Sequence, residues 1–544
     1  MAAMTGGDAV YDTLVALGVK HVFGIPSVHN IPIYDAIHRG GAITPIAVRH
    51  EQGALHAADG YARVTGSLGV AITSTGPGAS NGMTGLFEAG FASSRVLMIT
   101  GQTETQHYGK GKGVLHEAEN QLSMLRSVTR SVGSPRRSEE IAPVLIRVAR
   151  DICTGRPQPG AIEIPVDLQY GQVQVEIPAP GETVRIPADT ALLTEAGAML
   201  GSSAKRVIWA GGGVISSGAS EELLRLAEAL NAPVFTTING RGAIPEDHPL
   251  CMGAFIQQCR EFVPHADVML AVGTRFQGGS TADFSLQLPA RLIHLDADPQ
   301  MIGLNYKPDL ALVGDAKLGL AGILEALNAE PGDDEFCAQI EEACSEAKRG
   351  IRERMGPDYE RIMDSIRILL PRDGNIVRDP TVPAYIWANS LLPILTPGTS
   401  LQSTSSAIGP GLPLAIGAAL GSGRKTVVIQ GDGGFMLSIA ELATAAQHQV
   451  PVVVCVFNDQ GYGVLRMIQA ARFEGRTTAV DLSTPDFAAV AEAMGVEGVS
   501  VKGSDQFHSA FAQAMQAKGP VLLDIDMGSL EPMQGFGPPR RRSR

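Results

Sequence analysis

The 544-residue sequence lacks the features that mark secreted, membrane-spanning and nucleic-acid-binding proteins. Its opening segment, MAAMTGGDAVYDTLVALGVKHVFG, has no basic region followed by an apolar core, and no stretch reaches the roughly 18 apolar residues that span a bilayer. Positive charge is also scarce, since 43 basic residues face 56 acidic ones and give a formal net charge of -13. We therefore expect a cytoplasmic protein with no membrane and no nucleic-acid partner.

Cysteine is sparse and shows no pairing pattern. No CxxC pair occurs, and no histidine lies at metal-ligand spacing from a cysteine, so we predict reduced, structural thiols. The six cysteines are Cys153, Cys251, Cys259, Cys337, Cys344 and Cys455. With 44% apolar and 18% charged residues the composition is that of a globular protein. The chain is too long for one core, and its length predicts about three domains.

Short β-rich runs alternate with helical patterns in three successive blocks, which predicts three consecutive parallel-sheet α/β domains. The first covers residues 1–175 and leads into a Pro-rich connection from Gln174 to Asp189. The second covers residues 190–330, and its strands end at Gly, Asn or Asp, as in open α/β sheets. A charged helical segment leads to the third block, residues 370–530. We expect a basic, flexible tail over residues 531–544.

Two acidic residues follow the two apolar runs of a predicted βαβ unit in the third block. KTVVIQ and PVVVCVF are the expected strands, and FMLSIAELATAAQHQ is the expected crossover helix. Asp432 and Asp459 then lie past the carboxyl ends of strands in one sheet, where such sheets bind ligands. Two close carboxylates repel unless a cation lies between them, and oxygen ligands of this kind suit Mg²⁺. Gly433 and Gly434 leave backbone N–H groups open to a phosphate.

The same two acids also have a purely structural interpretation. Strand-end Asp residues commonly form turns or cap helices. The glycines are not followed by the Lys-Ser/Thr of a P-loop, and the GxGxxG of a dinucleotide site is absent here. The residues alone favour a metal–diphosphate clamp and leave the structural role open.

The pattern GDGG…VFNDQGYG resembles the signature of thiamine-diphosphate-dependent enzymes, in particular the acetolactate synthase, benzoylformate decarboxylase and benzaldehyde lyase group. RHEQGALHAADGYARVTG, TSTGPGASN and SSAIGPGLPLAIGAAL are similar to that group and occur in the expected order, so the resemblance covers nearly the whole chain. It implies that the first domain binds the pyrimidine and the third binds the diphosphate and Mg²⁺. In this family the first domain of one subunit meets the third domain of another at the cofactor, which implies a homodimer or homotetramer.

The resemblance also assigns roles to single residues. Mg²⁺ would be held by Asp432, Asp459 and the carbonyl of Gly461. Glu51 would hydrogen-bond the aminopyrimidine ring, a role that suits a carboxyl in an apolar pocket; a Glu in the first turn of a helix is also stabilised by the helix dipole. Ile408 would hold the cofactor in its bent shape. The other cofactor contacts implied are Asn81, Ser406, Gly433, Gly434 and Tyr462.

His29 and His116 are the candidate catalytic residues on the substrate side. His29 falls where benzaldehyde lyase also has a histidine, and His116 stands where acetolactate synthase and benzaldehyde lyase carry glutamine. Histidine titrates near neutral pH and can transfer protons to a reacting carbinol; a structural or surface role stays open for each. Val28 and Ser74 replace a serine and a histidine of benzoylformate decarboxylase, which argues against that strict activity.

Acetolactate synthase proper is not favoured either, because GTRFQGG keeps only part of that group's middle-domain pattern and NDQGYGVLRMIQ lacks an expected tryptophan. WAGGG alone is a weak sign of FAD or another dinucleotide, which we do not favour. We predict a thiamine-diphosphate- and Mg²⁺-dependent enzyme that makes or breaks the C–C bond next to a carbonyl of a 2-oxo acid, aldehyde or 2-hydroxyketone. The alternatives are an FAD-containing acetolactate synthase or pyruvate oxidase, and a catalytically silent cofactor-binding relative.

Overall fold

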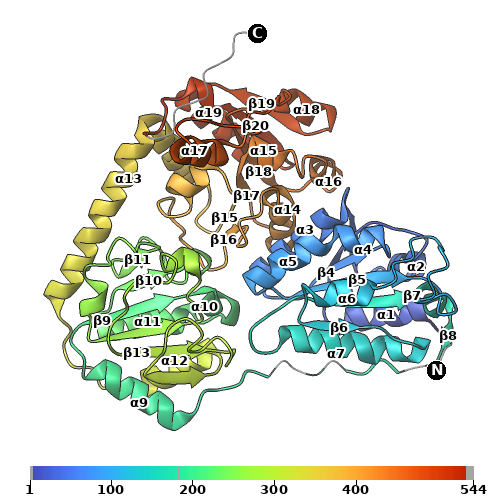
Figure 1. The fold of residues 1–544 in the computed structure, drawn as a ribbon, viewed down its shortest axis with the longest axis horizontal. Helices are drawn as coiled ribbons and strands as arrows, with labels where there is room; N and C mark the ends of the chain where they lie inside the picture. The colour runs from blue at the N-terminus through green and yellow to red at the C-terminus, as the bar shows by residue number, and fades with distance from the viewer. Residues whose placement is uncertain (1–3, 175, 180, 182–183, 535–544) are drawn as a thin grey trace.

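The computed structural model describes residues 4–174, 176–179, 181 and 184–534. It contains three α/β units, each built on a six-stranded parallel sheet, as the sequence predicts (Figure 1). We call them the N-terminal, central and C-terminal units. Residues 535–544 of the predicted basic tail lie outside the described part. Within the described residues, no helix has both the length and the apolar character needed to cross a membrane.

The N-terminal sheet has the order β3-β2-β4-β5-β7-β6. Helices α1, α2 and α7 cover one face, and α3 and α5 cover the other, so β4 and β5 are buried along their whole length. The strands are β2 (His21–Gly24), β3 (Thr44–Ala47), β4 (Gly69–Thr73), β5 (Val96–Gln102), β6 (Ser131–Gly133) and β7 (Gly160–Pro165). The helices are α1 (Gly6–Ala16), α2 (Ile31–Gly40), α3 (Glu51–Thr65), α4 (Pro77–Asn81), α5 (Met83–Ala92), α6 (Gln121–Arg126), α7 (Ile141–Cys153) and α8 (Val166–Tyr170), and β1 (Met4–Thr5) pairs with β8 (Gln172–Val173).

The C-terminal sheet repeats this topology, with the order β16-β15-β17-β18-β20-β19. β17 and β18 are parallel neighbours, which confirms the predicted βαβ unit. Its strands are β15 (Asn375–Arg378), β16 (Ser400–Gln402), β17 (Thr426–Gly431), β18 (Val452–Asn458), β19 (Glu497–Val501) and β20 (Val521–Asp526). Its helices are α14 (Gly411–Ser422), α15 (Asp432–Phe435), α16 (Glu441–Gln447), α17 (Gly463–Arg472), α18 (Phe487–Ala493) and α19 (Ser504–Gln516).

The crossover between β17 and β18 differs from the single helix that the sequence predicts over residues 435–449. It consists of the short α15, a turn and then α16. The turn places Leu437 against the loop at Gly409. The buried side chain of Glu441 accepts hydrogen bonds from the backbone N–H groups of Arg49 and His50, which lie in the N-terminal unit. These tertiary contacts override the local helical pattern.

The central sheet has a different order, β11-β10-β9-β12-β13-β14. Numbered within the unit this is 3-2-1-4-5-6, the doubly wound order whose switch point falls between its first and fourth strands, here β9 and β12. The strands are β9 (Arg206–Ala210), β10 (Val234–Thr236), β11 (Cys251–Gly253), β12 (Val268–Val272), β13 (Leu292–Asp296) and β14 (Leu310–Val313). The helices are α9 (Thr190–Gly201), α10 (Gly212–Ser217), α11 (Ser220–Leu230) and α12 (Ala316–Glu325).

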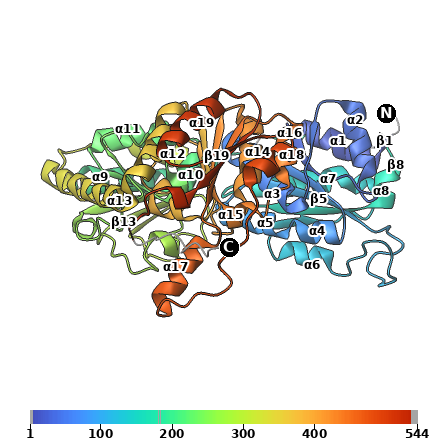
Figure 2. The ribbon, with the colours of Figure 1, turned by 90° about the horizontal axis from the view of Figure 1, so that it is seen from above.

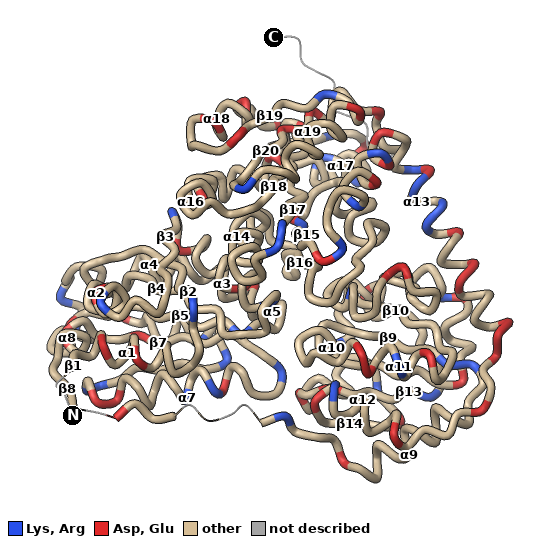
Figure 3. The backbone as a smooth tube through the Cα atoms, turned by 180° about the vertical axis from the view of Figure 1, so that it is seen from behind, with Lys and Arg blue, Asp and Glu red and all other residues tan. Residues whose placement is uncertain are grey.

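The long helix α13 (Asp334–Leu369) joins the central and C-terminal units and confirms the predicted charged helical segment. Figure 3 shows acidic and basic residues along its length. Its buried residues belong to a core shared by both units, and the Sγ atoms of Cys344 and Cys259 lie 3.2 Å apart in that core. Gly356, at φ 77°, interrupts the helical geometry, so α13 bends there.

The N-terminal and C-terminal units meet directly through α3 and α14, which lie side by side (Figures 1 and 2). A Cβ built on Gly60 would lie 2.0 Å from the Leu414 carbonyl oxygen, and one on Gly417 would lie 1.8 Å from that of Ala57. The two backbones therefore touch, and only glycine fits at these two positions. This contact fixes how the two sheets of like topology are oriented.

Candidate active site

Glu51 is the first residue of α3, and only 9% of it is exposed. Its Oε2 accepts a hydrogen bond of 3.0 Å from Nδ2 of Asn81, the last residue of α4. A Cβ built on Gly78 would lie 3.0 Å from the Glu51 Oε1 atom, so α4 packs closely on this carboxyl. The structure thus places two of the predicted cofactor-binding residues together, beyond the carboxyl end of β4.

The two candidate catalytic histidines are also brought together, although they lie 87 positions apart, at residues 29 and 116 of the chain. The ring centroids of His29 and His116 are 5.2 Å apart. Ser74, which directly follows β4, places its Oγ 3.1 Å from Nδ1 of His116 and 3.5 Å from Nδ1 of His29. Burial, and then the proximity of His116, lower the pKa of His29 and so favour its neutral form.

The His116 loop rests on a buried polar network that the sequence did not reveal. Glu163, fully buried on β7, accepts hydrogen bonds from Tyr108 Oη at 2.5 Å and from Gln121 Nε2 at 3.1 Å. Gln121 Oε1 in turn accepts from the backbone N–H of Gly76 at 2.8 Å. The one signal available was a charged residue inside the predicted strand GAIEIPV. The network joins the loop after β4 to the segment that carries His116.

Asp432 and Asp459 directly follow the neighbouring strands β17 and β18, as predicted. Asp432 is buried, and its Oδ2 accepts a hydrogen bond of 2.9 Å from the backbone N–H of Gly461. Burial and then the Asp459 carboxylate raise the pKa of Asp432 to about 7. Burial also raises the pKa of Asp459, against the opposing effect of Arg466. Because both carboxyl groups are buried and the Asp459 carboxylate further disfavours ionisation of Asp432, a cation would stabilise this site.

Arg466 on α17 is a neighbour of this site that the sequence analysis missed. Its Nη1 lies 3.0 Å from Oδ2 of Asp459, and its Nε lies 2.9 Å from Oδ1 of Asp481. α17 has no buried residue and projects from the body of the molecule (Figure 2). No sequence rule separates this arginine from other charged residues of an exposed helix.

The glycines after β17 pack tightly against two side chains. A Cβ built on Gly433 would lie 2.7 Å from the Tyr462 ring, and one on Gly434 would lie 2.5 Å from Oδ2 of Asp379. The contact with Gly433 brings the predicted residue Tyr462 to the turn that carries Asp432. Both glycines are therefore required by close packing, besides leaving their N–H groups at the start of α15.

Asp379, a second residue that the sequence analysis missed, holds the loop that carries Ser406 and Ile408. Its carboxyl accepts hydrogen bonds of 2.9 Å from the backbone N–H groups of Gly409 and Gly411. Ile408 is half-buried, and Ser406 is exposed with φ 64°. The loop is thereby fixed beside the turn after β17.

Comparison with known proteins agrees with this arrangement. Models of the thiamine pyrophosphate enzyme N-terminal TPP binding domain, central domain and C-terminal TPP binding domain match residues 4–124, 193–325 and 383–525. The chain belongs to the thiamine pyrophosphate enzyme family. It is 35% identical to a probable acetolactate synthase large subunit of Methanocaldococcus jannaschii, over 96% of this chain and 92% of that protein. It is 30% identical to the acetolactate synthase isozyme 3 large subunit of Escherichia coli K12, over 97% and 95% of the two chains.

The residues present in this thiamine pyrophosphate enzyme fit a metal-bound diphosphate. The acid pair after β17 and β18 would be stabilised by a divalent cation, and backbone N–H groups at the start of α15 suit a phosphate. Among the described residues, no three His, Cys, Asp or Glu side chains gather as a metal site. A bound ion would therefore need Asp432, Asp459, the Gly461 carbonyl and ligands from the diphosphate or water.

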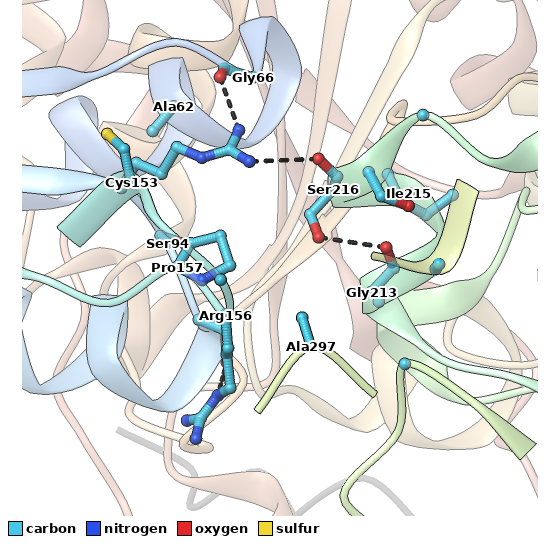
Figure 4. A pocket seen from close by; sticks show the side chains of 18 of the residues that line it. Ala62, Gly66, Ser94, Cys153, Arg156, Pro157, Gly213, Ile215, Ser216 and Ala297 are labelled. Atoms are coloured by element: carbon cyan, nitrogen blue, oxygen red, sulfur yellow. Dashed lines mark hydrogen bonds between the residues drawn. The ribbon is translucent and has the colours of Figure 1, made fainter. Parts of the chain in front are cut away.

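The central unit of this family member lines a separate large cavity. Its volume is about 1240 Å³, and it lies between the N-terminal and central units (Figure 4). Gly213 and Thr274, which follow β9 and β12, line it at the switch point of the central sheet. Arg95 links the two units beside this cavity, because its guanidinium donates to the carbonyls of Gly66 at 2.6 Å and Ser216 at 3.3 Å. Gly212 and Gly213 of the motif WAGGG, which the sequence analysis treated as a weak sign of a dinucleotide, are part of its lining.

Proposed function

We propose that this protein is a thiamine-diphosphate- and Mg²⁺-dependent carboligase, which decarboxylates a 2-oxo acid and joins the remaining acyl group to a second carbonyl compound. The observation that carries the proposal is the pair of half-sites on two sheets of like topology, one holding Glu51 with Asn81 and the other Asp432 with Asp459. The relatives named as acetolactate synthases support the carboligation.

Bound thiamine diphosphate would supply the electron sink for the bond-breaking and bond-forming steps. Asp432, Asp459 and the Gly461 carbonyl would hold the metal, and the N–H groups at Gly433 and Gly434 would bind the diphosphate. Glu51, kept in place by Asn81, would hydrogen-bond the pyrimidine ring and hold or release a proton at its carboxyl. Ile408 would contact the bound cofactor. His29 and His116 move protons at the reacting carbonyl oxygen.

We further propose that active sites form between two copies of the chain, in a homodimer or homotetramer. Large apolar side chains lie exposed beside both half-sites, which favours a protein partner there. Val28 (55% exposed) and Leu115 (63%) flank the two histidines in the chain, and Leu437 (56%) follows the glycine turn. Sedimentation velocity would test this assembly, because a monomer at micromolar concentration contradicts it.

A dinucleotide such as FAD is a second candidate ligand, at the central cavity. Sequence alone did not favour it, and the glycines of WAGGG are partly explained by packing, since a Cβ on Gly213 would lie 2.6 Å from the Cα of Gly273. The doubly wound strand order and a cavity at its switch point support the candidate. A flavin-containing acetolactate synthase or pyruvate oxidase would be yellow when purified. Colourless protein with no nucleotide released on denaturation contradicts this second candidate.

The main proposal is tested by incubating the protein with thiamine diphosphate, Mg²⁺ and a panel of 2-oxo acids, aldehydes and 2-hydroxyketones. Pyruvate, benzoylformate, benzaldehyde and benzoin are suitable members. Released CO₂ and products followed by NMR separate decarboxylation, lyase activity and carboligation. Absence of turnover with every member, while the cofactor still binds, would instead support a catalytically silent relative.

A further inference from the structure

Ser74 has no role in the function proposed so far, yet it lies between the two candidate catalytic histidines. It is 6% exposed, and its hydroxyl contacts Nδ1 of both rings. A hydroxyl has one proton to donate and lone pairs to accept, so it can donate to one ring while it accepts from the other. The His116 contact is the shorter at 3.1 Å, and the His29 contact is 3.5 Å. Catalytic hydrogen bonds are often long before substrate is bound.

The direction of this chain of hydrogen bonds depends on which nitrogen of His29 carries the proton. The backbone of Leu115, beside the His29 ring, raises the pKa of His29 in opposition to burial. A neutral imidazole has a single N–H, so the other nitrogen of His29 is an acceptor. If Nδ1 is that acceptor, Ser74 donates to His29 and its oxygen accepts from Nδ1–H of His116. The Nε2 atom of His116 is then left with its lone pair.

We propose that Ser74 is a positioning residue that couples His29 and His116 into one proton relay and fixes Nε2 of His116 as its base. The proposal rests on the carboligase function proposed above, because it specifies how that site takes up a proton. When His116 Nε2 accepts a proton from a substrate hydroxyl, its Nδ1 proton passes to Ser74 and the Ser74 hydroxyl proton passes to His29. In total, the relay takes up one proton from the substrate hydroxyl, His116 and Ser74 end neutral, and His29 carries the added positive charge.

The His116 loop is held firmly enough for such a relay. The Glu117 carboxylate accepts hydrogen bonds from the backbone N–H groups of Gly111 at 2.9 Å and Gly113 at 2.7 Å. His116 itself has φ 58°, a left-handed conformation that persists only where the surroundings enforce it. A Cβ on Gly76 would lie 2.4 Å from the His116 carbonyl oxygen, so the loop also packs against the backbone after β4.

Glu51 lies close to the relay without belonging to it. A Cβ built on Gly78 would contact Cβ of Ser74 at 2.8 Å and Oε1 of Glu51 at 3.0 Å. The titratable groups around Ser74 are therefore His29, His116 and, across Gly78, Glu51. This arrangement separates two tasks: activation of the cofactor by Glu51, and proton transfer to the reacting compound through Ser74.

The first test needs no substrate. Holoenzyme labelled with ¹⁵N-histidine would be compared by NMR in the wild-type protein, Ser74→Ala and Ser80→Ala. Ser80 is a matched control, because its hydroxyl bonds the Pro77 carbonyl at 2.9 Å on the neighbouring helix. We expect the Nδ1–H tautomer at His116 in the wild type and in Ser80→Ala, and a mixture of tautomers in Ser74→Ala. An Nε2–H tautomer at His116 in the wild type would overturn the relay.

The second test follows product formation with whichever panel compound turns over. We expect Ser74→Ala to lose about 10²-fold in kcat, Ser74→Thr to keep most activity because it retains the hydroxyl, and cofactor affinity to stay within twofold. In the His116→Gln background, Ser74→Ala should cost nothing more, because both act through one base. Additive losses, or weakened cofactor binding in Ser74→Ala, would show a structural role only. If no panel compound reacts, the proposed function fails while the NMR test still decides the relay.

Discussion

The N-terminal and C-terminal units share one strand order, but their half-sites differ in how many carboxyl groups they contain and in what neighbours them. In the N-terminal unit a single carboxylate, Glu51, is held by the neutral amide of Asn81. In the C-terminal unit two carboxyl groups, Asp432 and Asp459, lie close together, burial raises the pKa of both, and the Asp459 carboxylate raises that of Asp432 further. In the proposed function, the same scaffold carries a proton-exchanging site in one unit and a cation site in the other. The difference lies in the loops, which is why fold alone does not define function.

Replacing the carboxylate of the N-terminal half-site should have the largest effect. Glu51→Gln keeps the shape and a hydrogen bond but cannot exchange a proton with the pyrimidine, so we expect turnover to fall by about 10³-fold. Exchange of the thiazolium C2 proton of bound thiamine diphosphate, followed by ¹H NMR, should slow to a similar extent. The matched control is Glu139→Gln, an exposed acid of the same unit. Wild-type activity in Glu51→Gln would contradict the proposed mechanism.

The next prediction concerns a contact that holds the N-terminal and C-terminal units of one chain together. Glu88 on α5 is fully buried and accepts hydrogen bonds from the backbone N–H groups of Thr404 at 2.6 Å and Ser405 at 3.0 Å, across the boundary between the units. It also pairs with Arg63 at 2.9 Å. Glu88→Gln leaves part of the Arg63 charge unpaired and turns an amide donor toward these N–H groups. We expect a loss of about 3 kcal/mol in the free energy of unfolding.

Thermal unfolding measures this loss, with Glu139→Gln again as the exposed control. A lower cofactor affinity should accompany it, because the same segment continues to Ser406 and Ile408. An unchanged midpoint would show that the α3–α14 contact suffices to join the units. Unfolding of three units need not be a single transition, so the midpoint of each transition should be compared.

We expect Mg²⁺ affinity to depend on the acid pair of the C-terminal half-site and not on Glu51. Asp432→Asn removes one of the two carboxylates, and we expect Mg²⁺ affinity to fall by about 100-fold. Isothermal titration with Mg²⁺ in the presence of thiamine diphosphate gives the value, and chelation by EDTA should remove cofactor from the wild-type protein. Gln460→Asn, an exposed neighbour of Asp459, serves as the control. Equal affinities would rule out Asp432 as a ligand.

The two half-sites also differ in how far the sequence predicted them. Asp432 and Asp459 follow strands of one βαβ unit, and that local pattern sufficed to place them together. Glu51 and the histidines were assigned only by resemblance, because the approach of His29 to His116 depends on a long irregular loop. Burial of Glu163 and the bridging position of Ser74 depend on tertiary packing, which residue spacing does not encode. The parallel α/β class was predictable, since buried parallel strands are continuous apolar runs.

The smallest expected effect concerns Arg466, which pairs with Asp459 in the C-terminal half-site. Arg466 is a cation already placed 3.0 Å from Asp459, and neither Glu51 nor Asn81 has such a neighbour among the described contacts. Arg466→Met keeps an unbranched apolar stem and removes the charge, so Mg²⁺ no longer competes with it for Asp459. We expect Mg²⁺ affinity to rise by about fivefold, or about 1 kcal/mol. The control is Arg476→Met, an exposed arginine paired with Glu474. A fall in affinity would mean that Arg466 orients Asp459 for the metal rather than competing with it.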